Sequence, residues 1–107
     1  MKRVGMVIHV KPEKLAEYKK LHAEPWPGVI AALKAHHVHN YVIYHHADLL
    51  FGHLEYDGDD FKADMAEIAK DPVTQEWWKL TDPCQSPLAT RKEGEWWADM
   101  EEVFYMA

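Results

Sequence analysis

The chain has 107 residues, of which 48% are hydrophobic and 28% charged, and its formal net charge is −6 at pH 7. This length suits one domain with one core, and the acidic balance without a basic stripe argues against a nucleic-acid partner. No apolar run approaches the ~20 residues that a membrane-spanning helix needs, and the single cysteine, Cys84, has no partner for an internal disulfide. We therefore expect one domain over residues 1–107, soluble and cytoplasmic, with no membrane partner.

The first quarter of the chain predicts a strand followed by two helices. Residues 3–10 place an apolar side chain at every second position, which is typical of a half-buried strand. Pro12 suits the first turn of a helix that continues to His22. The prolines that follow interrupt this helix, and an apolar stripe from Trp26 to about residue 36 predicts a second one.

The middle of the chain predicts two paired strands. Residues 38–46 are rich in β-branched and aromatic side chains, and a tight turn at Ala47-Asp48 leads into a second run over 49–56. An Asp-rich turn with a helix N-cap follows. The remaining predicted elements are a helix from Phe61, a helix over 73–80, a long irregular stretch over 82–94 and a final strand over 100–106.

The predicted order of strand, helix, strand, strand, helix, strand is typical of an α+β fold. It indicates a ferredoxin-like βαββαβ arrangement, with a four-stranded antiparallel sheet and helices on one face. Val4, Met6, Ile43 and Phe51 are more apolar than a wet outer sheet face requires. A homodimer that packs sheet on sheet would cover that face.

Tyr18 and His22 are the first candidates for a functional site. Residues four apart on a helix lie on one face, so a phenol and an imidazole would point to one spot. Such a pair can bind a hydroxylated ligand and move a proton near neutral pH. The alternative is that both rings are half-buried packing residues.

Two pairs of tryptophans offer further aromatic surfaces. Adjacent helical residues point about 100° apart, so one of Trp77 and Trp78 can pack while the other faces a cleft. Either ring could cover the C–H face of a sugar, although a double tryptophan is also an ordinary hydrophobic anchor. The second pair, Trp96-Trp97, could close a pocket, but we favour a role in a dimer contact.

The eight histidines do not predict a metal site. Strand alternation would place His39, Tyr41, Ile43 and His45 on one face, with Val38 and its alternates on the other. Neither face offers three ligands with a nearby carboxylate, and there is no cysteine pair. We therefore expect no metal and no cofactor. Tyr41 remains a candidate for binding hydroxyl groups, and Glu101 or Glu102 could supply an inward carboxylate.

Several segments together carry a resemblance to a known family. The segments are Glu17-Tyr18 with His22, Trp26-Pro27, His39-Asn40-Tyr41 with Ile43-Tyr44, Leu50-Phe51, Trp77-Trp78 and Glu102-Val103-Phe104-Tyr105. With these segments the chain resembles the L-rhamnose mutarotase family nearly end to end, in the same order and with almost unchanged spacing.

The resemblance implies a dimeric α+β barrel of ferredoxin-like protomers that interconverts the α and β anomers of a 6-deoxy-hexose. By position, it implies that His22 is the proton donor and that Tyr18, Tyr41, Trp77 and Trp78 contact the sugar. Many family members carry an Asn-Pro-Asp-Asn-Ser-Pro-like segment before the last strand. Here the chain reads Asp82-Pro83-Cys84-Gln85-Ser86-Pro87, followed by an insertion-like stretch that ends in Trp96-Trp97.

The resulting prediction is a cofactor-independent sugar mutarotase whose substrate is a monosaccharide. Opening a hemiacetal needs only an acid and a base, and His22 is the expected acid/base group. L-rhamnose is the first expected substrate and L-fucose the alternative. Two other classes stay open from the sequence, namely a small ferredoxin-like monooxygenase and a non-catalytic sugar-binding dimer.

Overall fold

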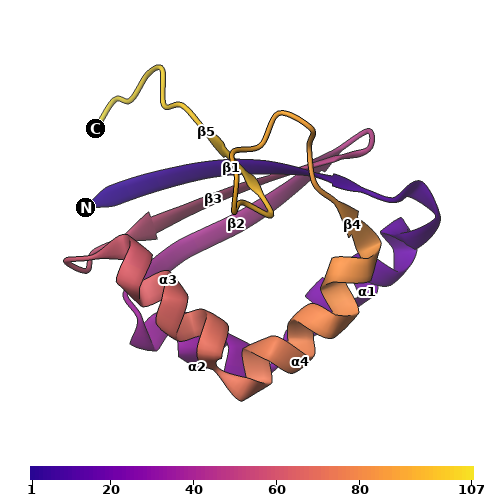
Figure 1. Cartoon of the computed structure of the whole chain (residues 1–107), viewed down its shortest axis with the longest axis horizontal. Coiled ribbons are helices and arrows are strands. Elements are labelled where there is room, and N and C mark those ends of the chain that lie inside the picture. Colours follow the sequence, from indigo (N-terminus) through magenta and orange to yellow (C-terminus); the bar gives the residue numbers. More distant parts are fainter.

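Four helices pack against one face of an antiparallel sheet in the computed structural model, which describes residues 1–107 (Figure 1). The long strands lie in the order β2-β3-β1, and two short strands, β4 and β5, pair with the free edge of β1. This confirms the ferredoxin-like α+β fold. The strands are β1 Lys2–Val10, β2 Val38–His46, β3 Leu49–Tyr56, β4 Gln85–Ser86 and β5 Ala98–Met100.

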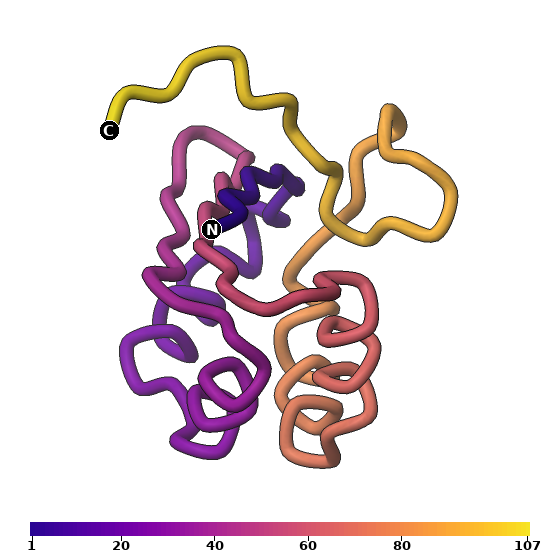
Figure 2. The backbone as a smooth tube through the Cα atoms, turned by 90° about the vertical axis from the view of Figure 1, so that its left-hand side faces the viewer, coloured from indigo at the N-terminus to yellow at the C-terminus, as the bar shows by residue number.

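The helices begin where their capping residues predict. Pro27 and Pro72 occupy the first turns of their helices, where a missing N–H leaves no hydrogen bond unmade. Asp60 and Asp71 are the N-caps of α3 and α4. Their side chains accept hydrogen bonds from Ala63 N at 3.1 Å and Thr74 N at 2.8 Å. Figure 2 shows the two helix pairs side by side. The helices are α1 Leu15–Ala23, α2 Pro27–Ala35, α3 Phe61–Lys70 and α4 Pro72–Thr81, with single 3-10 turns at Pro12–Lys14 and Asp82–Cys84.

The core lies between the helices and the inner sheet face, in two clusters. Val4 pairs with Leu54 in the sheet, and both are buried under the helices. Met6 packs against the same cluster, so the expectation that Val4 and Met6 line the outer face is wrong. The first cluster contains Val4, Val38, Leu54, Tyr56 and Ile68, and the second contains Ile8, Val10, Tyr18, Leu50 and Cys84.

A β-bulge interrupts β2 and changes which side chains face inward. The register shifts between His39 and Val42, and Asn40 adopts a left-handed φ of 48°. Val38 lies opposite inward-facing Tyr56, and Ile43 lies opposite inward-facing Gly52. The sequence predicts strict alternation along residues 38–46, which would place Val38 and Ile43 on opposite faces. That prediction is wrong, because the extra residue in the bulge turns Ile43 to the same inner face as Val38.

The C-terminal strand is shorter than the sequence predicts. Only Ala98–Met100 pairs with β1, and residues 101–107 form no strand, contrary to the expected strand over 100–106. Arg3 holds this segment through its side chain instead, with two hydrogen bonds to Glu102 at 2.7 and 2.8 Å and its guanidinium 3.3 Å from the centre of the Tyr105 ring. The tail extends away from the body (Figures 1 and 2). No helix of the fold is long and apolar enough to cross a membrane.

Candidate functional site

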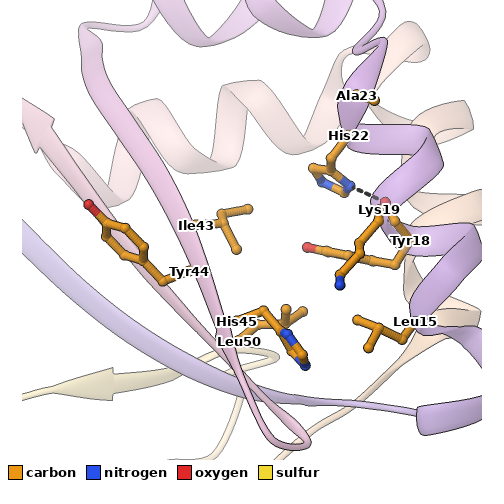
Figure 3. Close-up of a pocket in the computed structure, with 9 residues that line it drawn as sticks. All are labelled: Leu15, Tyr18, Lys19, His22, Ala23, Ile43, Tyr44, His45 and Leu50. Atoms are coloured by element: carbon orange, nitrogen blue, oxygen red, sulfur yellow. Dashed lines mark hydrogen bonds between the residues drawn. The ribbon is translucent and has the colours of Figure 1, made fainter.

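A cleft of about 270 Å³ separates α1 from β2 and β3 (Figure 3). The proline-bounded helix α1 presents Tyr18 and His22 to it from one side, and the strands present Ile43 and Leu50 from the other. A mostly apolar pocket with a few polar groups is the common form of a small-molecule site. The lining residues are Leu15, Tyr18, Lys19, His22, Ala23, Ile43, Tyr44, His45 and Leu50.

Tyr18 and His22 share this cleft, as their spacing predicts. Their rings stack with centroids 4.1 Å apart and planes at 27°. His22 Nδ1 lies 2.9 Å from the Tyr18 carbonyl oxygen, which can only accept, so Nδ1 carries the proton that is donated. When the ring is neutral, Nε2 therefore keeps its lone pair, and no protein group is hydrogen-bonded to it.

The environment of His22 favours the neutral ring. Burial lowers its pKa below the ordinary value of 6.5, and the hydrogen bond to Tyr18 opposes this only in part. At neutral pH the imidazole is therefore mostly uncharged. A neutral ring with a free Nε2 is a proton acceptor at the moment a substrate enters.

Tyr18 is buried and hydrogen-bonded at its hydroxyl group. Burial raises the pKa of the phenol, with a smaller contribution from the nearby Tyr41. Gln85 Nε2 donates to the Tyr18 hydroxyl at 3.2 Å, and Gln85 Oε1 accepts from Trp96 Nε1 at 2.9 Å. Neither Gln85 nor Trp96 was expected at this position, because both come from the stretch that the sequence marks only as irregular or insertion-like.

Tyr41 follows the left-handed Asn40 in the bulge of β2. Its side chain is 37% exposed, yet desolvation raises the pKa of its phenol to about 12. Both phenols thus stay protonated near neutral pH. Tyr18 lines the cleft, whereas Tyr41 is not among the residues that line it.

The two tryptophans of α4 have different environments. Trp77 is 6% exposed and meets His22 and Trp26 edge to face, each with ring centroids 5.3 Å apart. Trp78 is 38% exposed, and neither ring lines the cleft. The 100° separation therefore produces one packing residue, Trp77, and one exposed residue. Trp77 supports the imidazole from behind.

The other candidate groups lie away from the cleft. His39 pairs with Asp57 at 3.0 Å, and His36 pairs with Asp64 at 3.4 Å, near the opposite end of β2. Nowhere in the chain do three His, Cys, Asp or Glu side chains form a group that could hold a metal ion. Glu102 binds Arg3, so it is not an inward-facing base.

Comparisons with known proteins agree on one family. The family profile described as L-rhamnose mutarotase matches residues 3–106. An L-rhamnose mutarotase of Oceanobacillus iheyensis is 37% identical over 114 aligned positions, covering 99% of each chain. One of Listeria monocytogenes is 36% identical over 115 positions, covering both chains completely.

Solved structures give the same fold at lower sequence identity. The crystal structure of an L-rhamnose mutarotase from Formosa agariphila has a TM-score of 0.77 at 23% identity, with both chains fully covered. Tetracenomycin F2 cyclase from Streptomyces glaucescens has a TM-score of 0.60 at 24% identity, covering 100% of this chain and 97% of its own. These similarities concern the fold alone.

Proposed function

Since the chain belongs to the L-rhamnose mutarotase family, we propose that it interconverts the α and β anomers of L-rhamnose. The observation that carries this function is the family match over residues 3–106, across relatives aligned along their whole length. This match favours an isomerase over the monooxygenase and the non-catalytic sugar-binding dimer. Cytoplasmic localisation stays a prediction from the sequence.

The proposed site uses His22 as the base that starts ring opening. Its Nε2 takes the proton of the anomeric hydroxyl while the C1–O5 bond breaks and the C1=O1 bond forms. The electron pair of the broken bond goes to O5, which needs a proton from an acid. After the aldehyde rotates about C1–C2, closure runs the same steps in reverse. His22 is then the proton donor that the resemblance implies.

Tyr18 and Tyr41 are the proposed donors to the sugar oxygens, because both phenols stay protonated near neutral pH. Trp77 is proposed to hold His22 in place, since the indole meets the imidazole edge to face at 5.3 Å. Trp78 keeps its proposed role as a sugar contact only if a bound sugar extends past the cleft. The apolar side chains of Ile43 and Leu50 suit the C–H groups and the methyl group of a 6-deoxy-hexose.

The test is anomer exchange measured by NMR magnetisation transfer between the two anomeric protons of L-rhamnose. At low micromolar protein, exchange should be clearly faster than in buffer. L-fucose forms a second arm and identifies the preferred sugar. His22→Ala is the matched control, and it should return exchange close to the buffer rate. Exchange at the buffer rate for both sugars, with sugar-dependent quenching of Trp fluorescence, would instead indicate a non-catalytic binding protein.

We also propose a homodimer that packs through the outer sheet face. Val7, Phe51 and Tyr44 are direct register partners across β1, β3 and β2, on the side away from the helices. Although Tyr44 borders the cleft, Figure 3 shows its ring on the opposite side of β2 from Ile43, and the residue is 64% exposed. A second copy would cover this apolar row.

A further inference from the structure

Gln85 is a buried amide with a partner at each end. Its side chain comes from the short strand β4 and is only 5% exposed. The indole N–H of Trp96 can only donate, so the amide oxygen must face Trp96, at 2.9 Å. The NH₂ group is thereby directed at the Tyr18 hydroxyl, at 3.2 Å. One orientation of the amide satisfies both contacts.

This orientation decides where the hydroxyl proton of Tyr18 points. Because Gln85 donates to the Tyr18 oxygen, the phenol cannot donate in that direction. No other protein acceptor is hydrogen-bonded to the hydroxyl group. Figure 3 shows the ring of Tyr18 reaching across the cleft towards Ile43. The O–H is therefore left to point into the cleft, where a ligand would supply the acceptor.

The stretch that carries Trp96 is held firmly against the same body. Trp97 packs against the buried cluster that contains Tyr18. Its ring also lies over Gly52, where a Cβ atom added to the glycine would be 3.5 Å from the ring edge. The two indoles of the insertion-like stretch thus contact their own chain, where the sequence favoured a dimer contact. Trp97 anchors the segment, and Trp96 turns its N–H to Gln85.

We propose that Gln85 and Trp96 are positioning residues that make Tyr18 the proton donor to the ring oxygen. This inference rests on the proposed mutarotase function and assigns its second proton carrier. In ring opening, the Tyr18 proton moves to O5 as the C1–O5 bond breaks, while His22 Nε2 takes the proton from O1. In closure, O5 returns its proton to the Tyr18 oxygen as it attacks C1, and His22 returns the other to O1. Protons and electrons balance with no further reactant.

The decisive variant is Gln85→Glu, compared with Gln75→Glu as a matched control on the exposed side of α4. An ionised carboxylate only accepts, so it would turn the Tyr18 proton away from the cleft. We expect kcat for anomer exchange to fall roughly 10²- to 10⁴-fold at pH 7, with KM changed less than about twofold, as for loss of one proton-transfer group. Gln75→Glu should keep wild-type kcat.

The pH profile separates positioning from structural damage. A protonated carboxyl can donate to Tyr18 again, so the ratio of Gln85→Glu to wild-type kcat should rise as pH falls from 7 to 5. Trp96→Phe keeps an aromatic ring but frees the amide to turn over. The Trp96→Phe variant should lower kcat several-fold with KM preserved. In the Gln85→Glu variant, the NMR signal of the Trp96 indole N–H should shift.

Each outcome bears on a different claim. Wild-type protein that leaves exchange at the buffer rate overturns the proposed function and this inference together. Wild-type acceleration with unchanged kcat in Gln85→Glu overturns this inference alone. A loss of kcat whose ratio to wild type is constant from pH 7 to 5 also overturns it, because that result indicates a structural role. An indole signal that does not move excludes the contact itself.

Discussion

Burial decides the chemistry of His22. An exposed histidine at the end of a helix would gain from the nearby carbonyl groups and keep an ordinary or raised pKa. Here desolvation outweighs the hydrogen bond to the Tyr18 carbonyl and lowers the pKa. The same hydrogen bond fixes the proton on Nδ1, so one contact selects both the tautomer and the atom that acts as base.

This predicts a single acid limb in the pH profile of kcat/KM. Protonation of Nε2 removes the base. Activity is therefore lost as the pH falls through the lowered pKa of His22, and it reaches its full value above that pKa. We expect a midpoint below pH 6.5 and a plateau from pH 7 to 8, measured by NMR exchange in L-rhamnose. His22→Gln keeps a side chain of similar shape but should lower kcat roughly 10²- to 10⁴-fold. A midpoint above 6.5 would contradict the neutral ring.

The bulge in β2 is the element that places Tyr41. Asn40 tolerates a left-handed φ better than β-branched residues do. Asn40→Val should therefore lower the free energy of unfolding by about 1–2 kcal/mol and reduce kcat, because the bulge that orients Tyr41 is strained. Denaturant unfolding and NMR exchange measure the two effects. Asn40→Gly is the control that keeps the backbone angle, and equal stability of the two variants would disprove the backbone argument.

Position 52 in β3 needs a glycine, because the side chains of Met6 and Trp97 pack closely over it on the inner face. A Cβ there would lie 2.9 Å from Met6 Cε and 3.5 Å from the Trp97 ring. Gly52→Ala should lower the free energy of unfolding by about 1–3 kcal/mol through overpacking. Gly5→Ala, on the outer face and 3.3 Å from Met100 Cε, should have a smaller effect. Chemical denaturation of both variants checks this, and a larger loss at Gly5 would refute it.

The strands also show how far local patterns reach. β2 and β3 match their predicted bounds because composition and turn signals there are local, and Tyr18 and His22 follow from helical spacing alone. The bulge depends on register with β3, and the contact between Tyr18 and Gln85 joins residues 67 positions apart. The strand expected over 100–106 failed because only part of it has a partner edge on β1. Such features follow from tertiary pairing, which no single segment encodes.

At the scale of the whole molecule, the two sheet faces differ in function. The helix-covered face holds the core and the cleft, and the outer face presents the row of Val7, Phe51 and Tyr44. Tyr44 in this row is exposed and Val7 and Phe51 are half-buried, and a partly exposed apolar row of this kind is typical of an interface. The cleft lies between α1 and the strands, on the sheet face that the proposed dimer does not use.

Tyr44→Glu should therefore abolish dimer formation. A carboxylate at the β2 end of the apolar row would lose its hydration on association without a partner. Light scattering coupled to size-exclusion chromatography should give the dimer mass for the wild type and the monomer mass for the variant. Lys62→Glu, on the exposed side of α3, is the control that should remain dimeric. A monomeric wild type at micromolar concentration would refute the proposed dimer.

The tie between Arg3, Glu102 and Tyr105 brings the beginning and end of the described chain together. Figure 1 shows both ends on one side of the molecule and α1, which borders the cleft, on the other. A short peptide linker could join these ends and allow circular permutation, with new ends opened in the turn at Asp57-Gly58. Such a permutant could be immobilised on a support through that turn while the sugar still diffuses freely into the cleft.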